Sequence, residues 1–362
     1  MSIVRTPFAD LPTALVTELD DAGLDPRRVY DGVVEAVDED LPGPDVTTEA
    51  TIPAEATAWA DLTARADGVL AGGAVAELVL RFVAGDHLEI ERKVADGEQV
   101  RRGDVVMSVK GPVRALLTAE RTALNFLGHL SGVATTTRTW VDALEGTGAQ
   151  VRDTRKTIPH FRALEKYAVR CGGGLNHRAT LSDQALVKDN HVLAAGGVVE
   201  AYDAVRRHFP EVPVQVEVTT LEQLTDLLAA GCDQILLDNM DVSTTREAVE
   251  INAGRARLEA SGGLSLDRAR EVGIEDVEME VEKARAGDPA GAAGPKAGTA
   301  AGTPAIPRRR PKKRRIPGDP PEGTTDVPGG DKTGKQFDYL LCFGGTRTIL
   351  HAGVPPTPRF VN

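Results

Sequence analysis

The strongest constraint on the fold of this chain is a regular alternation of short apolar runs with amphipathic segments, which begins at residue 149. The segments 201–209 and 220–231 carry apolar residues three and four positions apart, which predicts helices. The second also has a capping pattern from Thr220 to Gln223 and a stop at Gly231. Because strands that alternate with helices form a parallel sheet or a barrel, we predict an α/β barrel. Its strands are expected at 149–154, 185–190, 212–218, 234–239 and 257–263.

The residues before this alternation predict a smaller mixed α/β unit. Helical patterning occurs near 11–24 and 29–37. Residues 96–112 alternate apolar and polar side chains between glycines, which is typical of short strands and resembles a hammerhead sheet without an attached cofactor. Residues 116–146 carry the pattern of helices that lead into the barrel. We therefore divide the chain into an N-terminal domain, a barrel domain and a tail, with bounds 1–115, 116–277 and 278–362.

The tail differs from the rest of the chain in composition. It holds 13 glycines and 12 prolines among 85 residues, which predicts a low-complexity and largely disordered segment. It is also basic, with 14 Lys and Arg against 9 Asp and Glu. The run RRRPKKRR at 308–315 leaves two interpretations open, a solvated tail or a patch that binds nucleic acid.

Charge and cysteine content exclude several classes of protein. Residues 1–277 carry 28 Lys and Arg against 45 Asp and Glu, and an acidic surface of this kind repels nucleic acid. The three cysteines, Cys171, Cys232 and Cys342, form no CxxC pair, which argues against disulfides or a zinc site and favours a reducing compartment. No apolar run is long enough to cross a bilayer, and the N-terminus lacks the apolar core of a signal peptide. We expect a cytoplasmic protein with no membrane partner.

Polar side chains gather where the predicted strands end. In a barrel the carboxyl ends of all strands meet at one rim, where such enzymes carry out their chemistry. Cations in an otherwise acidic chain indicate an anionic ligand, because arginine matches carboxylate or phosphate oxygens and lysine acts as a point charge on phosphate. The rim therefore suits a phosphorylated sugar together with a small carboxylate. Its candidate residues are Arg155, Lys156, His177, Arg178, Lys188, Glu217, Asp238, Ser261, Gly262 and Gly263.

The acidic and glycine-rich members of this set leave several interpretations open. Glu217 and Asp238 can hold ribose hydroxyls, contact Mg²⁺ through water, or stabilise developing positive charge. The backbone N–H groups of 261–263 follow a late strand, which is where barrels commonly bind phosphate. No spacing of His or Cys predicts a metal held by the protein alone.

Several motifs, taken together and in order, resemble the quinolinate phosphoribosyltransferase family. They are ERTALNFLGHLSG, DTRKTIPHFRALEKYAVRCGGGLNHR, LVKDNH, VEV, LLDNM and LEASGG, and the resemblance covers roughly residues 10–275. It implies an N-terminal α/β sandwich domain, an open α/β barrel, and a homodimer whose active sites form between subunits. It also implies that quinolinate and phosphoribosyl pyrophosphate give nicotinate mononucleotide, pyrophosphate and CO₂, with Mg²⁺ bound to the substrate.

The resemblance implies a role for each residue on the quinolinate side. Arg121 matches an arginine that enters the partner subunit's site and contacts a quinolinate carboxylate. Arg155, His177 and Arg178 match the remaining carboxylate-binding set. The glycines of 172–174 are expected to let their loop approach the ligand.

On the phosphoribosyl side, the resemblance implies the catalytic set. Lys156 and Lys188 match lysines near the pyrophosphate and the sugar phosphate. Glu217 and Asp238 match the acidic pair near the ribose, close to the substrate-bound Mg²⁺. The residues that match half of a 5′-phosphate cradle are Ser261, Gly262 and Gly263.

The chain departs from the family near Val277, where the family continues with another strand, a phosphate-binding turn and a closing helix. We therefore expect that the barrel lacks its last strand, that the neighbouring strand is unpaired, and that only 337–343 offers a replacement. Two alternatives to the family reaction follow. One is a nicotinate phosphoribosyltransferase, whose substrate has a single carboxylate. The other is a non-catalytic relative with an aberrant C-terminus whose basic tail binds nucleic acid.

A few conspicuous side chains have simpler interpretations. Glu165 and Lys166 read as a solvated pair on a helix. His191 is expected to cap the strand that precedes it, and Cys171 to be a small packing residue. His129 is interpreted as a surface residue or as one that supports the site indirectly.

Overall fold

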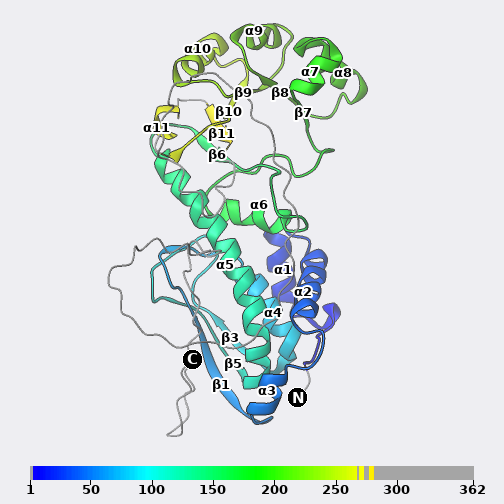
Figure 1. Cartoon of the computed structure of the whole chain (residues 1–362), viewed down its shortest axis with the longest axis vertical. Coiled ribbons are helices and arrows are strands. Elements are labelled where there is room, and N and C mark those ends of the chain that lie inside the picture. The colour runs from blue at the N-terminus through cyan, green and yellow to red at the C-terminus, as the bar shows by residue number, and fades with distance from the viewer. Residues whose placement is uncertain (1–2, 267–268, 273–276, 281–362) are drawn as a thin grey trace, which may run out of the picture. The chain divides into compact units, whose positions relative to one another are not determined.

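The computed structural model of the chain describes residues 3–266, 269–272 and 277–280. Its N-terminal part combines helices with a three-stranded antiparallel sheet of order β1-β5-β3 (Figure 1). Strands β2 and β4 form a separate antiparallel pair. This arrangement confirms the mixed α/β unit, including the strands expected within 96–112. The elements are α1 (Thr13–Asp21), α2 (Pro26–Asp40), α3 (Val46–Thr51), β1 (Thr57–Thr63), β2 (Gly68–Val69), α4 (Gly73–Ala84), β3 (Glu89–Arg92), β4 (Gln99–Val100) and β5 (Val105–Pro112), with short 3-10 turns at Phe8–Asp10 and Gly85–His87.

Helix α4 forms the centre of the N-terminal core. Its sequence, GAVAELVLRFVA, is apolar on nearly every side, and a helix of that kind is stable only when it is surrounded. All of its residues except Arg81 are buried. Its first turn is closed by Asp96, whose carboxylate accepts the N–H groups of Gly72 at 2.7 Å and Gly73 at 3.0 Å. The carboxylate satisfies backbone donors that have no partner within the helix.

A single helix of 31 residues, α5 (Val113–Ala143), follows the N-terminal strands. The sequence predicts helices over 116–146, and the structure joins them into one. Pro112 directly precedes the first helical residue. Proline suits this position because it has no N–H group, and N–H groups at the start of a helix have no partner within the helix. Helix α5 packs against α4 and α6, so both halves of the molecule use it.

The second part is a six-stranded parallel sheet of order β6-β11-β10-β9-β8-β7, with helices in the connections (Figure 1). Its strands are β6 (Gln150–Arg152), β7 (Ala185–Val187), β8 (Val214–Val218), β9 (Gln234–Asp238), β10 (Arg257–Ser261) and β11 (Val277–Glu280). The helices are α6 (Arg162–Cys171), α7 (Asp189–Ala195), α8 (Val198–His208), α9 (Leu221–Ala229), α10 (Val242–Asn252) and α11 (Ala269–Val272). The five strands predicted from the apolar runs are all present, and the parallel α/β class is confirmed.

Local chemistry explains why each connection folds as it does, and α9 is a clear case. Thr220 Oγ1 accepts the Gln223 N–H at 3.2 Å, and Gln223 Oε1 accepts the Thr219 N–H at 2.9 Å. The bond to Thr220 is the one that the capping pattern predicts, whereas the Gln223 side chain accepts from Thr219, one residue before the N-cap, and not from Thr220. Leu224 and Leu227 are fully buried against the sheet. The helix ends before Gly231, whose φ of 79° lies in the left-handed region.

The prediction that the barrel lacks its last strand is wrong. Strand β11 lies between β10 and β6 and pairs in parallel with both, so the neighbouring strand β10 has partners on each side. The place for which 337–343 was considered as a replacement strand is therefore already occupied by β11. The sequence hid this strand because it is only four residues long and alternates Val277 and Met279 with two glutamates. The predicted disorder of the tail, its basic run and its replacement strand lie outside the described residues.

Within the described part of the chain, no helix combines the length and the apolar character needed to span a bilayer.

Candidate active site

Four neighbouring strands each present a residue predicted for the site at or near the carboxyl end. Strand β7 ends just before Lys188, β8 contains Glu217, β9 ends at Asp238 and β10 ends at Ser261. Lys188 Nζ donates a 2.9 Å hydrogen bond to Glu217 Oε2, with the lysine side chain half exposed and the glutamate side chain 12% exposed. Asp238 and Ser261 are register partners on adjacent strands. The structure therefore brings these residues to one rim of the sheet.

Lys188 is held by the start of α7. The His191 ring accepts the backbone N–H of Lys188 at Nδ1 over 3.0 Å, and the His191 N–H donates to the Lys188 carbonyl oxygen over 2.8 Å. These two bonds close the junction between strand and helix, which confirms the capping role expected for His191. They fix the backbone from which the lysine side chain extends.

Arg155 and Lys156 lie in the loop that follows β6. The Nε of Arg155 is buried and has no hydrogen-bond partner among the described residues. Leaving a buried donor unpaired costs about 1–3 kcal/mol, which an acceptor oxygen of a bound anion would offset. Lys156 has an exposed side chain, and its backbone N–H donates to Thr154 Oγ1 at 2.9 Å. The loop is thus ordered locally, with Arg155 partly buried and Lys156 exposed to solvent.

Arg162, at the start of α6, connects the two loops that carry the predicted arginines. It was not selected from the sequence, where no pattern distinguishes it from other helix residues. Its guanidinium donates to the Ala179 carbonyl oxygen at 2.9 Å and to Thr157 Oγ1 at 3.0 Å. A longer contact of 3.4 Å reaches the carbonyl oxygen of Arg155. Arg162 therefore sets the separation of the loops on which Arg155 and Arg178 lie.

His177 is buried and uncharged, which corrects its interpretation as one of the cations of the rim. It is 6% exposed. Its Nδ1 accepts the backbone N–H of Arg178 at 2.7 Å, so the ring proton is on Nε2, which lies 2.7 Å from Gln215 Oε1. Burial, reinforced by the positive charge of Arg152, lowers the pKa of His177 to about 4. The ring is neutral near pH 7 and orients the backbone at Arg178.

The hydrogen bonds of His177 extend into a buried chain across the sheet. Gln215 Nε2 donates to Glu259 Oε2 at 2.8 Å, and Arg152 Nη1 donates to the same oxygen at 2.6 Å. Gln215, Glu259 and Arg152 are all almost fully buried. Gln215 and Glu259 were not selected from the sequence, although a polar residue inside an apolar strand run is a usable signal.

A second buried cluster anchors the loop from α6 to His177. Lys166 Nζ donates to Asp153 Oδ1 and to the His177 carbonyl oxygen, and Asp153 also accepts the His177 N–H at 2.8 Å. Lys166 is 5% exposed, and burial lowers its pKa. Glu165 is 1% exposed and accepts from His129 at 2.9 Å and from the Ile158 N–H at 3.2 Å. The interpretation of Glu165 and Lys166 as a solvated pair is therefore wrong.

The glycines at 172–174 serve packing. A Cβ at Gly172 would lie 2.6 Å from Thr137 Cβ, and one at Gly174 would lie 2.7 Å from Thr137 Cγ2. Gly173 has a φ of 87° and closes the end of α6. The loop is pressed against α5 at these positions, so the expectation that its glycines provide approach to a ligand gives way to a steric requirement.

The turn after β10 contains two left-handed glycines, Gly262 with a φ of 85° and Gly263 with a φ of 62°. A Cβ at Gly262 would lie 2.6 Å from Cγ of Asn239. This turn therefore requires glycine. It follows strand β10 directly and lies against Asn239, the neighbour of Asp238.

Arg121 lies on α5, and its side chain is exposed. Its neighbours Thr122, Ala123 and Leu124 are buried. Arg121 is thus presented on the solvent side of a helix that is otherwise packed into the molecule, where a partner of any kind can reach it.

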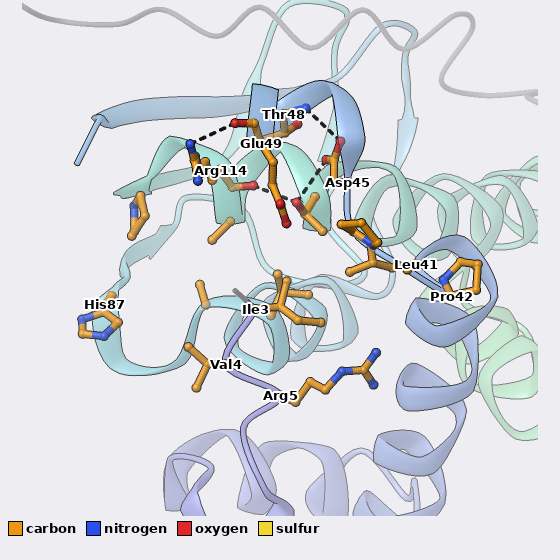
Figure 2. Close-up of a pocket in the computed structure, with 17 residues that line it drawn as sticks. Ile3, Val4, Arg5, Leu41, Pro42, Asp45, Thr48, Glu49, His87 and Arg114 are labelled. Atoms are coloured by element: carbon orange, nitrogen blue, oxygen red, sulfur yellow. Dashed lines mark hydrogen bonds between the residues drawn. The ribbon is translucent and has the colours of Figure 1, made fainter. Parts of the chain in front are cut away.

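One cavity in the described part of the chain, of about 360 Å³, lies away from this rim, and none of the predicted site residues lines it (Figure 2). Two of its polar side chains, those of Arg114 and Asp45, are hydrogen-bonded within the protein. Arg114 donates to the carbonyl oxygens of Ile52 at 2.9 Å and Glu49 at 3.1 Å, and Asp45 accepts the Thr48 N–H at 2.9 Å. The rim, with an unpaired buried donor and exposed cations, is the better candidate active site.

Among the described residues there is no group of three or more His, Cys, Asp or Glu side chains that could hold a metal ion. Glu217 and Asp238 supply two carboxylates on adjacent strands. Two carboxylates suit a hard cation such as Mg²⁺ that keeps waters and arrives with phosphate ligands of its own.

Comparison with known proteins connects this rim to one family. Residues 45–131 match the model of the quinolinate phosphoribosyl transferase N-terminal domain, and residues 133–281 match that of its C-terminal domain. A nicotinate-nucleotide pyrophosphorylase [carboxylating] of Mycobacterium leprae is 50% identical over 256 residues, which are 69% of this chain and 89% of the relative. A probable enzyme of the same name from Bacillus subtilis is 39% identical over 230 residues, 63% of this chain and 79% of the relative.

Solved structures are also similar to the chain. NadC from Streptococcus pyogenes superposes with a TM-score of 0.67 at 38% identity, covering 75% of this chain and 92% of that one. The nicotinate-nucleotide pyrophosphorylase from Francisella tularensis gives a TM-score of 0.67 at 34% identity, covering 71% and 90%.

Proposed function

Because the chain belongs to the quinolinate phosphoribosyltransferase family, we propose that it transfers the phosphoribosyl group of phosphoribosyl pyrophosphate to quinolinate, giving nicotinate mononucleotide, pyrophosphate and CO₂. This is a pentosyl transfer that serves NAD biosynthesis. The observation that carries the proposal is the rim itself, where an unpaired buried donor on Arg155 lies in one loop and a lysine–carboxylate pair lies on the neighbouring strands.

Quinolinate is a planar dianion, and the arginine loops suit it. Arg155 and Arg178 carry guanidinium groups of the kind that match carboxylate oxygens, and Arg178 Nη1 also donates to the Gln184 carbonyl oxygen at 2.9 Å. Arg162 holds both loops in place, and the neutral His177 ring fixes the backbone at Arg178. Arg121 supplies a further guanidinium from a second copy of the chain in the proposed homodimer.

Phosphoribosyl pyrophosphate occupies the strand ends beside these loops. The C1–O bond to pyrophosphate breaks, pyrophosphate leaves with the electron pair, and the quinolinate nitrogen forms the new bond to C1. Lys156 and Lys188 stabilise the leaving pyrophosphate, while Glu217 and Asp238 stabilise positive charge that develops on the ribose. The turn at 261–263 receives the 5′-phosphate on its backbone N–H groups.

Decarboxylation follows from the product of the transfer. The ring nitrogen is now positively charged, so it accepts the electron pair of the bond to the adjacent carboxylate as CO₂ departs. A proton from solvent then takes the place of the carboxylate on the ring carbon, which leaves nicotinate mononucleotide.

Three further parts of the proposal concern the surroundings of the reaction. Glu217 and Asp238 would hold, through water, a Mg²⁺ that arrives with phosphoribosyl pyrophosphate, and the ion would supply charge neutralisation at the phosphates. The chain acts as a homodimer with shared sites. It works in the cytoplasm, which the free thiols of Cys171 and Cys232, the two cysteines in the described part of the chain, favour.

The test uses the full chain with phosphoribosyl pyrophosphate and Mg²⁺, and compares quinolinate with nicotinate as acceptor. Losing one desolvated contact to a carboxylate costs about 2–5 kcal/mol, so quinolinate should be used at least about thirtyfold better in kcat/KM. Equal use of both acceptors would instead support a nicotinate phosphoribosyltransferase. No product from either acceptor, together with tight binding of RNA, would support the non-catalytic alternative.

A further inference from the structure

Asn239 makes contacts that tie two predicted parts of the rim together. Its side-chain Nδ2 donates to Asp238 Oδ2 at 2.8 Å. Its backbone N–H donates to the Ser261 carbonyl oxygen at 2.8 Å. One residue thus holds the carboxylate at the end of β9 and the start of the turn that follows β10.

The backbone of Asn239 explains why asparagine suits this position. Its φ of 54° lies in the left-handed region, which few residues other than glycine adopt without strain. Asparagine is one of those few, and its short amide can reach the neighbouring carboxylate. Glycine would adopt the backbone but has no donor, and aspartate would offer a carboxylate oxygen where a donor is needed.

Gly262 completes the arrangement from the other side. A Cβ at Gly262 would come within 2.6 Å of Asn239 Cγ and 2.9 Å of its Nδ2. The amide that binds Asp238 therefore occupies the space that a side chain at 262 would fill. An alanine at this position would push the amide away from Asp238.

We propose that Asn239 is a positioning residue that aims the Asp238 carboxylate and fixes its placement relative to the turn at 261–263. The proposal rests on the proposed function, in which Asp238 faces the ribose and the turn binds the 5′-phosphate. Asn239 then sets the affinity for phosphoribosyl pyrophosphate and leaves the affinity for quinolinate almost unchanged.

The first experiment replaces Asn239 with glycine in the full chain and measures kcat and the KM of each substrate. Asn239→Gly keeps the left-handed backbone and removes the amide. The KM for phosphoribosyl pyrophosphate should rise about tenfold, the size expected for a lost hydrogen bond to a charged group, while the KM for quinolinate should change less than about twofold. A role confined to folding would move both KM values together or neither.

The matched control is Ala253→Gly. Ala253 also has a left-handed backbone, with a φ of 47°, but it lies at the end of α10, before the amino end of β10. This substitution repeats the backbone change without touching Asp238, so both KM values should stay at their original level.

The second experiment adds Gly262→Ala, alone and combined with Asn239→Gly. Alone, it should raise the KM for phosphoribosyl pyrophosphate more than Asn239→Gly does, because it displaces the same amide and also strains the left-handed turn that receives the 5′-phosphate. In the double variant the effects should not add, because the amide is already absent. An unchanged KM in Asn239→Gly, an equal rise for both substrates, or additive effects in the double variant would overturn the proposal.

The failure of the positioning role can be separated from failure of the proposed function. A wild-type chain that neither turns over nor binds phosphoribosyl pyrophosphate by calorimetry would overturn the function and the inference with it. A wild-type chain that is active while Asn239→Gly behaves normally would overturn the inference alone.

Discussion

Lowering the pH is expected to destabilise the chain through His177. The ring is buried, and its pKa is lowered to about 4 from an ordinary value of 6.5. Between these two values the unfolded chain binds a proton at His177 that the native chain does not bind. The contribution of this ring to the free energy of unfolding is therefore complete above pH 6.5 and is lost as the pH falls toward 4. The pKa difference corresponds to roughly 3 kcal/mol over the whole window.

The measurement is urea unfolding of the full chain at several pH values between about 7 and 4.5, with His177→Gln as the control variant. Glutamine keeps a polar side chain near Gln215 and cannot titrate. Acidic groups elsewhere titrate in both proteins, so the difference between the two pH profiles isolates the ring. The wild-type profile should fall more steeply by on the order of 1 kcal/mol per pH unit within the window. Parallel profiles would refute the argument that a buried neutral ring sits at the centre of the site.

Three other outcomes follow from the contacts of the site. Arg162→Lys should weaken quinolinate binding by about 1–3 kcal/mol in calorimetry, because a lysine cannot bond both Ala179 and Thr157; unchanged binding would show that the two loops hold themselves apart. Lys166→Met should destabilise the chain by about 3–5 kcal/mol in urea because it leaves Asp153 buried without its cation, and adding Asp153→Asn should recover part of that loss. Two truncated chains test strand β11: one lacks 281–362 and keeps the strand, and the other lacks 277–362 and loses it with both of its ladders. The free energy of unfolding should be lower in the second chain by roughly 3 kcal/mol or more. Equal stability of the two chains would contradict the pairing of β11.

Much of the barrel could be predicted from sequence because its signals are local. A buried parallel strand such as β9 appears in the sequence as a continuous apolar run. The start of α9 is indicated by a capping residue, Thr220, directly before the helix. Strand β11 lacks that signal, since two of its four residues are glutamates and the alternation is too short to stand out. It is recognised only through its partners β6 and β10, which are distant in sequence.

The site divides in the same way. Some site residues could be predicted because each lies at or near the carboxyl end of a predicted strand, a criterion that needs only the local sequence. These residues are Lys188, Glu217, Asp238 and Ser261. The neutral state of His177 could not be predicted from the sequence, because it depends on burial of the ring and on the charge of Arg152, which lies on β6. Arg152 and Glu259 are bonded across 107 residues, and no local pattern predicts such a partner.

The glycine-rich loop shows how a correct observation can receive the wrong cause. The sequence suggested that the glycines of 172–174 bring backbone close to a ligand. The close approach is real, but its object is Thr137 on α5. A run of glycines signals that something lies near the backbone without saying what it is.

The buried chain from Arg152 through Glu259 and Gln215 to His177 has a consequence for how this rim can change over evolutionary time. Replacing any single member leaves a buried partner without its hydrogen bond or counter-charge, and such losses cost several kcal/mol in a protein with a small net stability. Nearly every single-step mutational path therefore passes through an unstable intermediate. We expect the interior of the rim to diverge as a correlated set, while exposed positions on the surrounding helices drift one at a time.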